Sequence, residues 1–368
     1  MPAMFQEILV PVDLSPHSSA ALAYALGLRE GEKPIARDAR VTVVHALDTA
    51  SVDLGAASEV LDLHANLRRH VVADLGQFVD RHAGSDFRCE RRVVDGSAVA
   101  AIERLTRELK PHLVVMGTHG RTGLARNILG SVAETAVRRS PVPVLCLKAL
   151  PDRTAPRPAA IRKVLVPTDG TAHSRAALPF AIAFCRHHDA SLAVLRVARD
   201  GDEARKLRAK GPLFPESQLE RPPAAHLPIG WKVVVKKGPR PPVEWVVHTG
   251  PTESWIAAAA EDLGADLICM ASHGPHRFPR SLLAGTTEMV VRLATVPVLA
   301  LTPALVVPRA RKAKAEEATA ADEVLEVLEE ATEPPADAAP ETATAPAAEP
   351  EATTTPDAAP EPASEPKG

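Results

Sequence analysis

One stretch of the chain has residue types and spacing that suit phosphate chemistry: GTHGRTGLARNILGS, at residues 117–131. Glycines stand at Gly117, Gly120 and Gly130, the hydroxyl of Ser131 follows directly, and the apolar run HLVVM precedes the whole. Glycines at the end of a buried strand let backbone N–H groups approach an anion, and a helix that begins at the last glycine adds its N-terminal dipole. We therefore predict a phosphate-binding loop. Closure of turns is the alternative explanation for any single glycine.

Two better-known phosphate loops do not fit the chain. A P-loop needs a lysine and a hydroxyl residue directly after its last glycine, and no glycine of this stretch is followed by lysine. A dinucleotide fingerprint needs Gly-x-Gly-x-x-Gly after the first strand, where this chain has PVDLSPHS. The loop therefore belongs to another class of phosphate site.

An internal repeat organises the 368 residues. ILVPVDLSPHSSAAL, which begins at Ile8, matches VLVPTDGTAHSRAAL, which begins at Val164, at an offset of 156. HLVVMGTHG matches DLICMASHG, and VPVLCL matches VPVLAL, both at an offset of 154. Two copies of one domain therefore lie in tandem, and we place them at residues 1–150 and 158–303.

Each copy alternates short apolar strands with helix-period segments. In the first copy we predict strands at EILVPVD, VTVVHAL, CERRVV, HLVVMG and VPVLCL, with helices near 16–30, 57–82, 97–109 and 131–139. The second of these helices should turn an apolar face inward, formed by Leu61, Leu67, Val71, Leu75 and Phe78. Strands separated by helices favour parallel pairing with right-handed crossovers. The predicted class is α/β, with two tandem, doubly wound, Rossmann-like parallel sheets.

Charge divides the chain into a basic body and an acidic tail. Fifteen acidic residues and one lysine follow residue 315, so this end carries −14 and residues 1–315 carry +11, against −3 for the whole chain. Residues 304–368 are rich in Ala, Pro, Thr and Glu and cannot bury enough apolar surface to offset their ordering entropy. We expect them to be disordered, apart from a short helix in TAADEVLEVLEEAT that could serve as a docking element. A contact of this tail with the basic body is a hypothesis.

Several classes of protein are disfavoured by composition. The basic residues are spread along the body, which favours a solvated surface over a nucleic-acid stripe. The N-terminus lacks a charged leader with an apolar stretch, and no apolar run approaches membrane-spanning length, so we expect a soluble cytoplasmic protein. Cys89, Cys146, Cys185 and Cys269 stand singly, which predicts buried free thiols and no metal or disulfide framework.

The motifs resemble those of the universal stress protein family. VPVD, VVMGTHGRTG, LGSVAE and PVPVL in the first copy and VPTD, MASHG and VPVL in the second carry the resemblance across both repeats. The signature of the ATP-binding branch, Gly-two-Gly-nine-Gly-Ser/Thr, is matched by Gly117, Gly120, Gly130 and Ser131. The resemblance implies that the first domain binds ATP, with magnesium on the phosphates.

Site residues follow from this resemblance position by position. It implies that Asp13 bonds the adenine or ribose, that Pro11 and Val12 lie beside it, and that the backbone of Ala46 contacts the adenine. The residues implied around the ribose and phosphates are Gly117, Gly120, Gly130, Ser131 and Val132. Arg121 is our own addition to the site, as a cation facing the phosphates; a solvated loop charge is the alternative.

Two side chains carry competing interpretations. Asp13 is a lone carboxylate at the end of a buried strand, which is costly unless an amino group or ribose hydroxyl donates to it; the alternative is a helix cap for the helix that follows. His119 is either a general base or a partner of the local backbone, and we assign no catalytic residue.

The second copy departs from the signature. At the offset of 154, Ala271 replaces Gly117, Ala284 replaces Gly130 and Gly285 replaces Ser131; a slip of one residue restores Gly285-Thr286 with ten intervening residues. Pro275 and Pro279 remove N–H donors from this loop. We expect weak nucleotide binding or none, with Asp169 surviving at its strand end.

These observations predict a nucleotide-dependent sensor or adaptor in a stress response, with an unidentified protein partner. The last strands VPVLCL and VPVLAL would be exposed edges unless paired, so we expect an intrachain pseudo-dimer, with further homo-oligomerisation left open. The alternatives are a slow ATPase or phosphotransferase, and a nucleotide-independent interaction scaffold. Fast phosphoryl transfer lacks its usual lysine and acidic metal pair.

Overall fold

The first repeat folds as the strand and helix pattern predicts. The computed structural model describes residues 4–30, 34, 36–48, 57–83, 89–118, 129–148, 161–211, 241–272 and 285–302. The elements of the first repeat are β1 (Glu7–Pro11), α1 (Pro16–Gly27), β2 (Arg40–Leu47), α2 (Ala57–Ala83), β3 (Glu90–Asp95), α3 (Ala98–Leu109), β4 (Leu113–Gly117), α4 (Ser131–Arg139) and β5 (Val144–Leu147). The predicted tail, at 304–368, lies outside the described residues.

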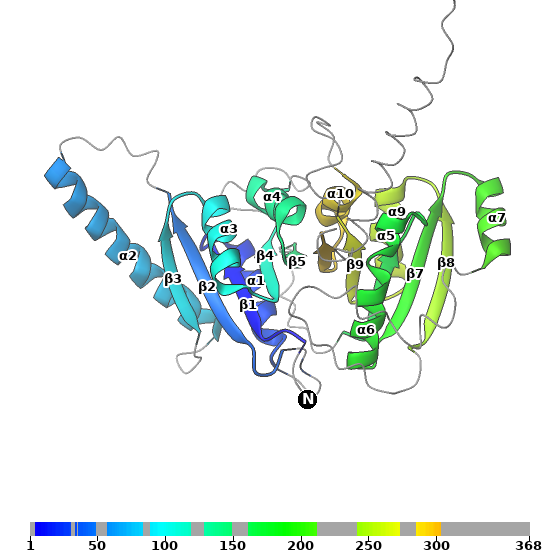
Figure 1. Ribbon diagram of the computed structural model, residues 1–368, viewed down its shortest axis with the longest axis horizontal. Coiled ribbons are helices and arrows are strands. Elements are labelled where there is room, and N and C mark those ends of the chain that lie inside the picture. The colour runs from blue at the N-terminus through cyan, green and yellow to red at the C-terminus, as the bar shows by residue number, and fades with distance from the viewer. Residues whose placement is uncertain are drawn as a thin grey trace, which may run out of the picture. The chain divides into compact units, whose positions relative to one another are not determined.

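The second repeat follows the same order with one helix divided. Its elements are β6 (Lys163–Pro167), α5 (Ala172–Arg175), α6 (Leu178–His188), β7 (Ser191–Ala198), α7 (Gly201–Lys210), β8 (Val243–Thr249), α9 (Thr252–Asp262), β9 (Leu267–Ala271), α10 (Thr286–Leu293) and β10 (Val298–Leu301). Together α5 and α6 stand where the first repeat has the single helix α1 (Figure 1).

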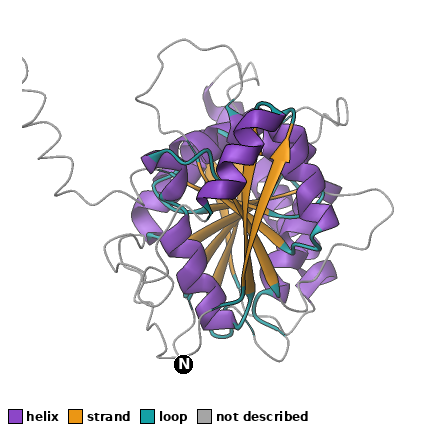
Figure 2. Ribbon diagram, turned by 90° about the vertical axis from the view of Figure 1, so that its right-hand side faces the viewer, coloured by secondary structure: helices purple, strands orange, loops and turns teal. Residues whose placement is uncertain are grey.

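All strands join one sheet in the order β3-β2-β1-β4-β5-β10-β9-β6-β7-β8. Pairing is parallel within each repeat and antiparallel where β5 meets β10. Helices cover both faces of the sheet (Figure 2). This confirms the predicted α/β class with two tandem, doubly wound domains, and it places a change of winding direction between β1 and β4, where such sheets bind ligands.

The predicted pairing of the last strands is also confirmed. Leu145 pairs with Leu299, while Val144 pairs with Ala300 and Cys146 with Val298. Because these partners repeat at the offset of 154, an approximate twofold axis passes through the Leu145–Leu299 pair. The edge of each half-sheet is thereby covered by the other repeat of the same chain.

Helix α2 corrects one sequence-based expectation. Leu75 and Phe78 are buried as predicted and Val71 is half-buried, but Leu67 is 38% exposed. Leu63, which was not assigned to the inward face, is 53% exposed, and the side chain of Leu61 lies outside the described part of the helix. The helix has 27 residues and is about 40 Å long, whereas its neighbour β3 has six residues and spans only about 20 Å. The first half of α2 therefore extends past the sheet that would have covered it (Figure 1).

The cysteines and the helices bear on two further predictions. Cys146, Cys185 and Cys269 are buried free thiols as expected, and burial raises the pKa of Cys146 to about 12; Cys89 is free but only half-buried. Among the described residues, none of the helices combines the length and the apolarity needed to span a bilayer.

Candidate functional site

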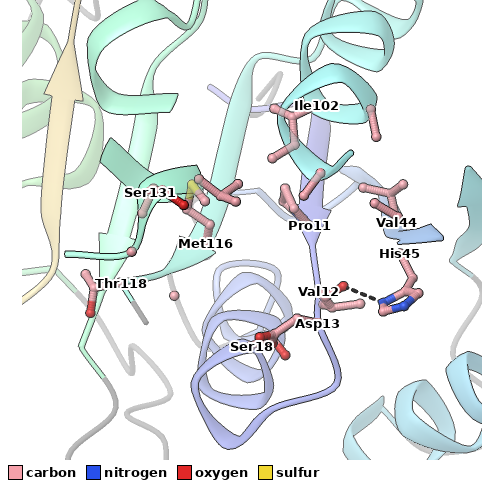
Figure 3. A pocket seen from close by; sticks show the side chains of 17 residues that line it. Pro11, Val12, Asp13, Ser18, Val44, His45, Ile102, Met116, Thr118 and Ser131 are labelled. Atoms are coloured by element: carbon pink, nitrogen blue, oxygen red, sulfur yellow. Dashed lines mark hydrogen bonds between the residues drawn. The ribbon is translucent and has the colours of Figure 1, made fainter. Parts of the chain in front are cut away.

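A cavity of about 240 Å³ opens at the carboxyl ends of β1, β2 and β4, beside the first turns of α3 and α4 (Figure 3). Eight of the ten predicted site residues line it: Pro11, Val12, Asp13, Ala46, Gly117, Gly130, Ser131 and Val132. The other two, Gly120 and Arg121, lie outside the described residues, as does His119. The predicted residues described by the structure therefore converge on one cavity, located where the winding of the sheet reverses.

Sequence reasoning missed about half of the lining. The additional residues are Ser18, Val44, His45, Ala98, Ala101, Ile102, Met116, Thr118 and Ala133. Most are small or apolar and come from the strand ends and from α3, whose first turn faces α4 across the cavity (Figure 3). Apolar residues at such positions resemble ordinary core residues in a sequence, so only the fold identifies them as a slot for a flat, apolar group.

Asp13 places a negative charge at one side of the cavity. Its Oδ1 accepts from the backbone N–H of Ser15 at 3.1 Å and from the Ser15 hydroxyl at 2.5 Å. Burial disfavours ionisation of Asp13, but the hydrogen bonds from Ser15 and Ser18 outweigh that effect and lower the pKa of the carboxyl. At neutral pH this group is an acceptor only, suited to a ligand that presents a hydroxyl or an amino group.

The capping alternative for Asp13 is resolved in favour of Ser15. Ser15 is the N-cap of α1, and its Oγ accepts from the backbone N–H of Ser18 at 3.4 Å. Asp13 holds that cap in place by accepting from it. The sequence left this alternative open, because Asp and Ser are equally good N-cap residues and only the geometry distinguishes them.

His45 fixes the end of β2 against the end of β1. The imidazole is buried, and its Nδ1 lies 2.8 Å from the carbonyl oxygen of Val12 (Figure 3). A carbonyl oxygen can only accept, so Nδ1 carries the proton in this hydrogen bond. Val12, His45 and Ala46 all line the cavity, so this bond joins two parts of its wall.

Gly117 lines the cavity and is also constrained by helix packing. A Cβ built on this residue would lie 2.8 Å from the carbonyl oxygen of His17 and 3.1 Å from the His17 Cβ. The backbone of α1 therefore packs directly on the end of β4, and any larger residue must displace it. Helix packing is thus a second reason for glycine at this position, beside the predicted approach of an anion.

The start of α4 lies at another side of the cavity. Gly130 is its N-cap with extended backbone angles, φ −62° and ψ 143°, and it makes no side-chain capping hydrogen bond. The Gly130 amide donates to the carbonyl of Thr118 at 2.8 Å, which joins the helix start to the end of β4. A first turn without a side-chain cap presents its amides and dipole to a ligand, and the exposed Ser131 adds a hydroxyl at the same place.

The second repeat has a carboxylate at the position of Asp13 but differs from the first repeat at the position of Gly117. Asp169 accepts from the N–H and hydroxyl of Thr171 at 2.9 and 2.7 Å, and from the hydroxyl of Ser174. Burial raises the pKa of Asp169, but these bonds outweigh it and the net shift is downward. Ala271 stands at the place of Gly117 and is buried.

Helix α10 begins one residue later in the repeat than α4. Gly285 is its N-cap, so it takes the capping place of Gly130 while standing at the sequence position of Ser131. A Cβ on Gly285 would lie 2.5 Å from Oε2 of Glu288. The carboxylate of Glu288 therefore lies against the N-cap residue of its own helix. The loop with Gly274, Pro275, Pro279 and Ala284 lies outside the described residues.

Known proteins match this chain across both repeats. The model of the universal stress protein family matches residues 4–148 and 160–302. A universal stress protein of Mycolicibacterium smegmatis is 27% identical over 315 residues, covering 80% of this chain and 97% of its own length. A universal stress protein of Mycobacterium bovis is 28% identical over 235 residues, covering 63% of this chain and 75% of its own.

The fold has a counterpart among solved structures. The crystal structure of a universal stress protein from Archaeoglobus fulgidus aligns with a TM-score of 0.55 and 22% identity, over 80% of this chain and 98% of its own. Together with the family match, which spans most of the chain, this establishes the class: the protein belongs to the universal stress protein family and has its tandem, two-domain form.

Proposed function

We propose that the first domain binds an adenine nucleotide, ATP with Mg²⁺, in the cavity between β1, β4, α3 and α4. The observation that carries this proposal is the polarity of the cavity: an ionised, acceptor-only carboxylate, Asp13, at one side and the uncapped start of α4 with Ser131 at the other. Apolar residues line the space between them. A nucleotide has the matching order of groups: amino and hydroxyl donors, a flat base and an anionic phosphate chain.

Magnesium would be carried by the nucleotide rather than by the protein. Within the described residues, no three His, Cys, Asp or Glu side chains are grouped to hold a metal ion. Mg²⁺ is commonly bound through substrate phosphates with few protein ligands, so this arrangement fits its chemistry. The ion would neutralise phosphate charge that the described lining, which contains no Lys or Arg, does not neutralise.

We infer that the protein acts as a nucleotide-dependent sensor or adaptor and that the second domain is a partner for the first. Occupancy of the cavity would report the nucleotide state, and the two domains, at about 1–150 and 158–303, would respond as one unit through the β5–β10 junction. Slow ATP hydrolysis in the same cavity is a separate outcome that a turnover assay of the wild-type protein measures directly.

The deciding experiment uses the matched carboxylates of the two repeats. Asp13 and Asp169 each accept from the N–H and hydroxyl of the residue two positions later, but only Asp13 lines the cavity. Titration calorimetry with Mg-ATP should show one site in the wild type and in Asp169→Ala. In Asp13→Ala the affinity should fall about 10- to 100-fold, the cost of losing a hydrogen bond to a charged group.

Three outcomes would contradict the proposal. Absence of heat in the wild type would remove nucleotide binding and favour the scaffold interpretation. Equal weakening in both variants would assign the loss to the turns and not to ligand contact. Two sites in the wild type would show that the second repeat binds nucleotide as well.

A further inference from the structure

Helix α4 is shared between the cavity and the second domain. Its first turn, from Ser131 to Ala133, lines the cavity. Its last turns carry Arg138, and the chain then enters β5, which pairs with β10. A nine-residue helix is about 13 Å long and moves as one rigid body, so contacts at its end fix the position of its start.

An ion cluster joins this helix to α10. Arg138 contacts Glu288 of α10, Nε to Oε1, at 3.4 Å, and it contacts Glu134 of its own helix at 2.7 Å. Arg292 of α10 lies 3.7 Å from Oε2 of Glu134. Arg138 and Arg292, like Glu134 and Glu288, are separated by 154 residues, so the two cross-domain pairs are related by the approximate twofold axis.

The two cross-domain pairs are not equivalent in burial. The Glu288 side chain is 7% exposed, whereas that of Glu134 is 31% exposed. A buried carboxylate is costly unless a cation compensates it, and among the described residues the ion pair of Glu288 is with Arg138. The pairing of Glu288 with Arg138 is therefore the stronger constraint on where α4 lies.

Three further hydrogen bonds hold the same junction. Ser272 donates from its hydroxyl to the carbonyl of Val137 at 2.9 Å, and Thr302 donates to the carbonyl of Ser140 at 2.9 Å. Lys148 donates to the carbonyl of Arg292 at 3.0 Å. The second domain thus holds the C-terminal end of α4 through two hydroxyl groups and the Glu288 carboxylate, and Lys148 of the first domain holds the end of α10 in the same way.

We propose that Glu288 of the second domain is a positioning residue for the nucleotide site of the first domain, acting through Arg138 and helix α4. This inference rests on the proposed nucleotide binding and goes beyond it, since it gives the second domain a role in that site without a ligand of its own. The physical basis is preorganisation: a binding group held in place before the ligand arrives loses less freedom on binding.

The test is Glu288→Gln, which keeps the shape of the side chain and removes its charge. Calorimetry with Mg-ATP should show a dissociation constant raised about three- to tenfold, a size typical of coupling through packed elements. Glu288→Asp, which keeps the charge, should recover part of the affinity. The control for charge alone is Glu244→Gln, which removes an exposed carboxylate from the Lys163–Glu244 pair, at 3.3 Å, in the same domain but away from α4. Its dissociation constant should equal that of the wild type.

A second readout separates positioning from general loss of stability. In the wild-type protein Mg-ATP should slow the hydrogen exchange of the α10 amides at 286–293. The reason is that the ligand holds the start of α4, and the end of α4 contacts α10. In Glu288→Gln this slowing should be reduced, while the slowing of the amides at 130–133 persists at saturating nucleotide.

Each result distinguishes the two proposals. An unchanged dissociation constant in Glu288→Gln, with binding intact in the wild type, overturns the positioning role alone. Equal weakening of binding by Glu244→Gln also overturns the positioning role alone, because the loss of any negative charge in the second domain would then have the same effect. Absence of binding in the wild type overturns the proposed function and the positioning role with it.

Discussion

The two repeats of this chain place the same polar turn on the same fold and build different surroundings for it. Asp13 and Asp169 both end a first strand, and both accept from the hydroxyl residue two positions later. The helix that follows is continuous in the first repeat, as α1, and divided into α5 and α6 in the second. A shared motif at one strand end therefore does not by itself make a shared site.

Proline explains the divided helix. Pro179 lies in the first turn of α6, where the first repeat has Ala23 in the middle of α1. Proline lacks the N–H that would bond the carbonyl four residues earlier, that of Arg175, and α5 ends at that residue.

The largest effect on stability is expected at a position where the two repeats are structurally equivalent. Leu145 and Leu299 pair across the approximate twofold axis and are both buried. Leu145→Ala and Leu299→Ala should each lower the free energy of unfolding by about 2–5 kcal/mol through the cavity left behind. Denaturant unfolding measures this. Effects differing by more than about 2 kcal/mol would show that the junction is not symmetric in energy, and a double variant would show how far the two sites couple.

The next largest effect on stability is expected at a position where the two repeats differ, Gly117 and its counterpart Ala271. Gly117→Ala brings a methyl group against the His17 backbone and should cost about 1–3 kcal/mol of stability, the usual range for overpacking. Ala271→Gly, the reciprocal change, should cost about 1 kcal/mol or less through chain entropy. Equal stability of Gly117→Ala and wild type in denaturant unfolding would contradict the packing explanation of this glycine.

The smallest effect concerns pH and should be shared by both repeats. Hydrogen bonds hold the pKa of Asp13 and of Asp169 below the ordinary value of 3.8. A lowered folded-state pKa contributes stability that is present above the unfolded-state pKa and is lost as the pH falls through the folded one. Stability should thus decline below about pH 4, and Asp13→Asn and Asp169→Asn should each flatten that decline. Urea unfolding at a series of pH values measures the free energy of unfolding. If both variants lose stability below pH 4 as steeply as the wild type, the assignment is contradicted.

Local patterns predicted most of the secondary structure. The helix from Ser131 to Arg139 has the predicted bounds, and the helix expected near 57–82 is found at 57–83. The inward face of that helix was only half right, because periodicity reveals which residues share a face and not how far the neighbouring sheet reaches. Leu67 belongs to the apolar stripe and still lies outside the core.

The candidate site was predicted on the strand ends and at the start of α4, and its wall from α3 was missed. The signature residues of the described chain do line one cavity, but Ala98, Ala101 and Ile102 from α3 do not differ in sequence from ordinary core residues. The packing reason for Gly117 was missed as well. Its contact with His17 joins residues 100 positions apart, and no local pattern records such a distance.

By itself, the sequence determined the repeat, the alternation of strands and helices, and the pairing of the last strands, since periodicity, turn residues and the need to cover a sheet edge are local or nearly local properties. Only the tertiary structure decided which glycine serves packing, which residues close the cavity, and that Glu288 lies against Arg138. These facts depend on where rigid elements meet, and a contact between residues 150 positions apart in the sequence is set by the packing of the whole domain pair.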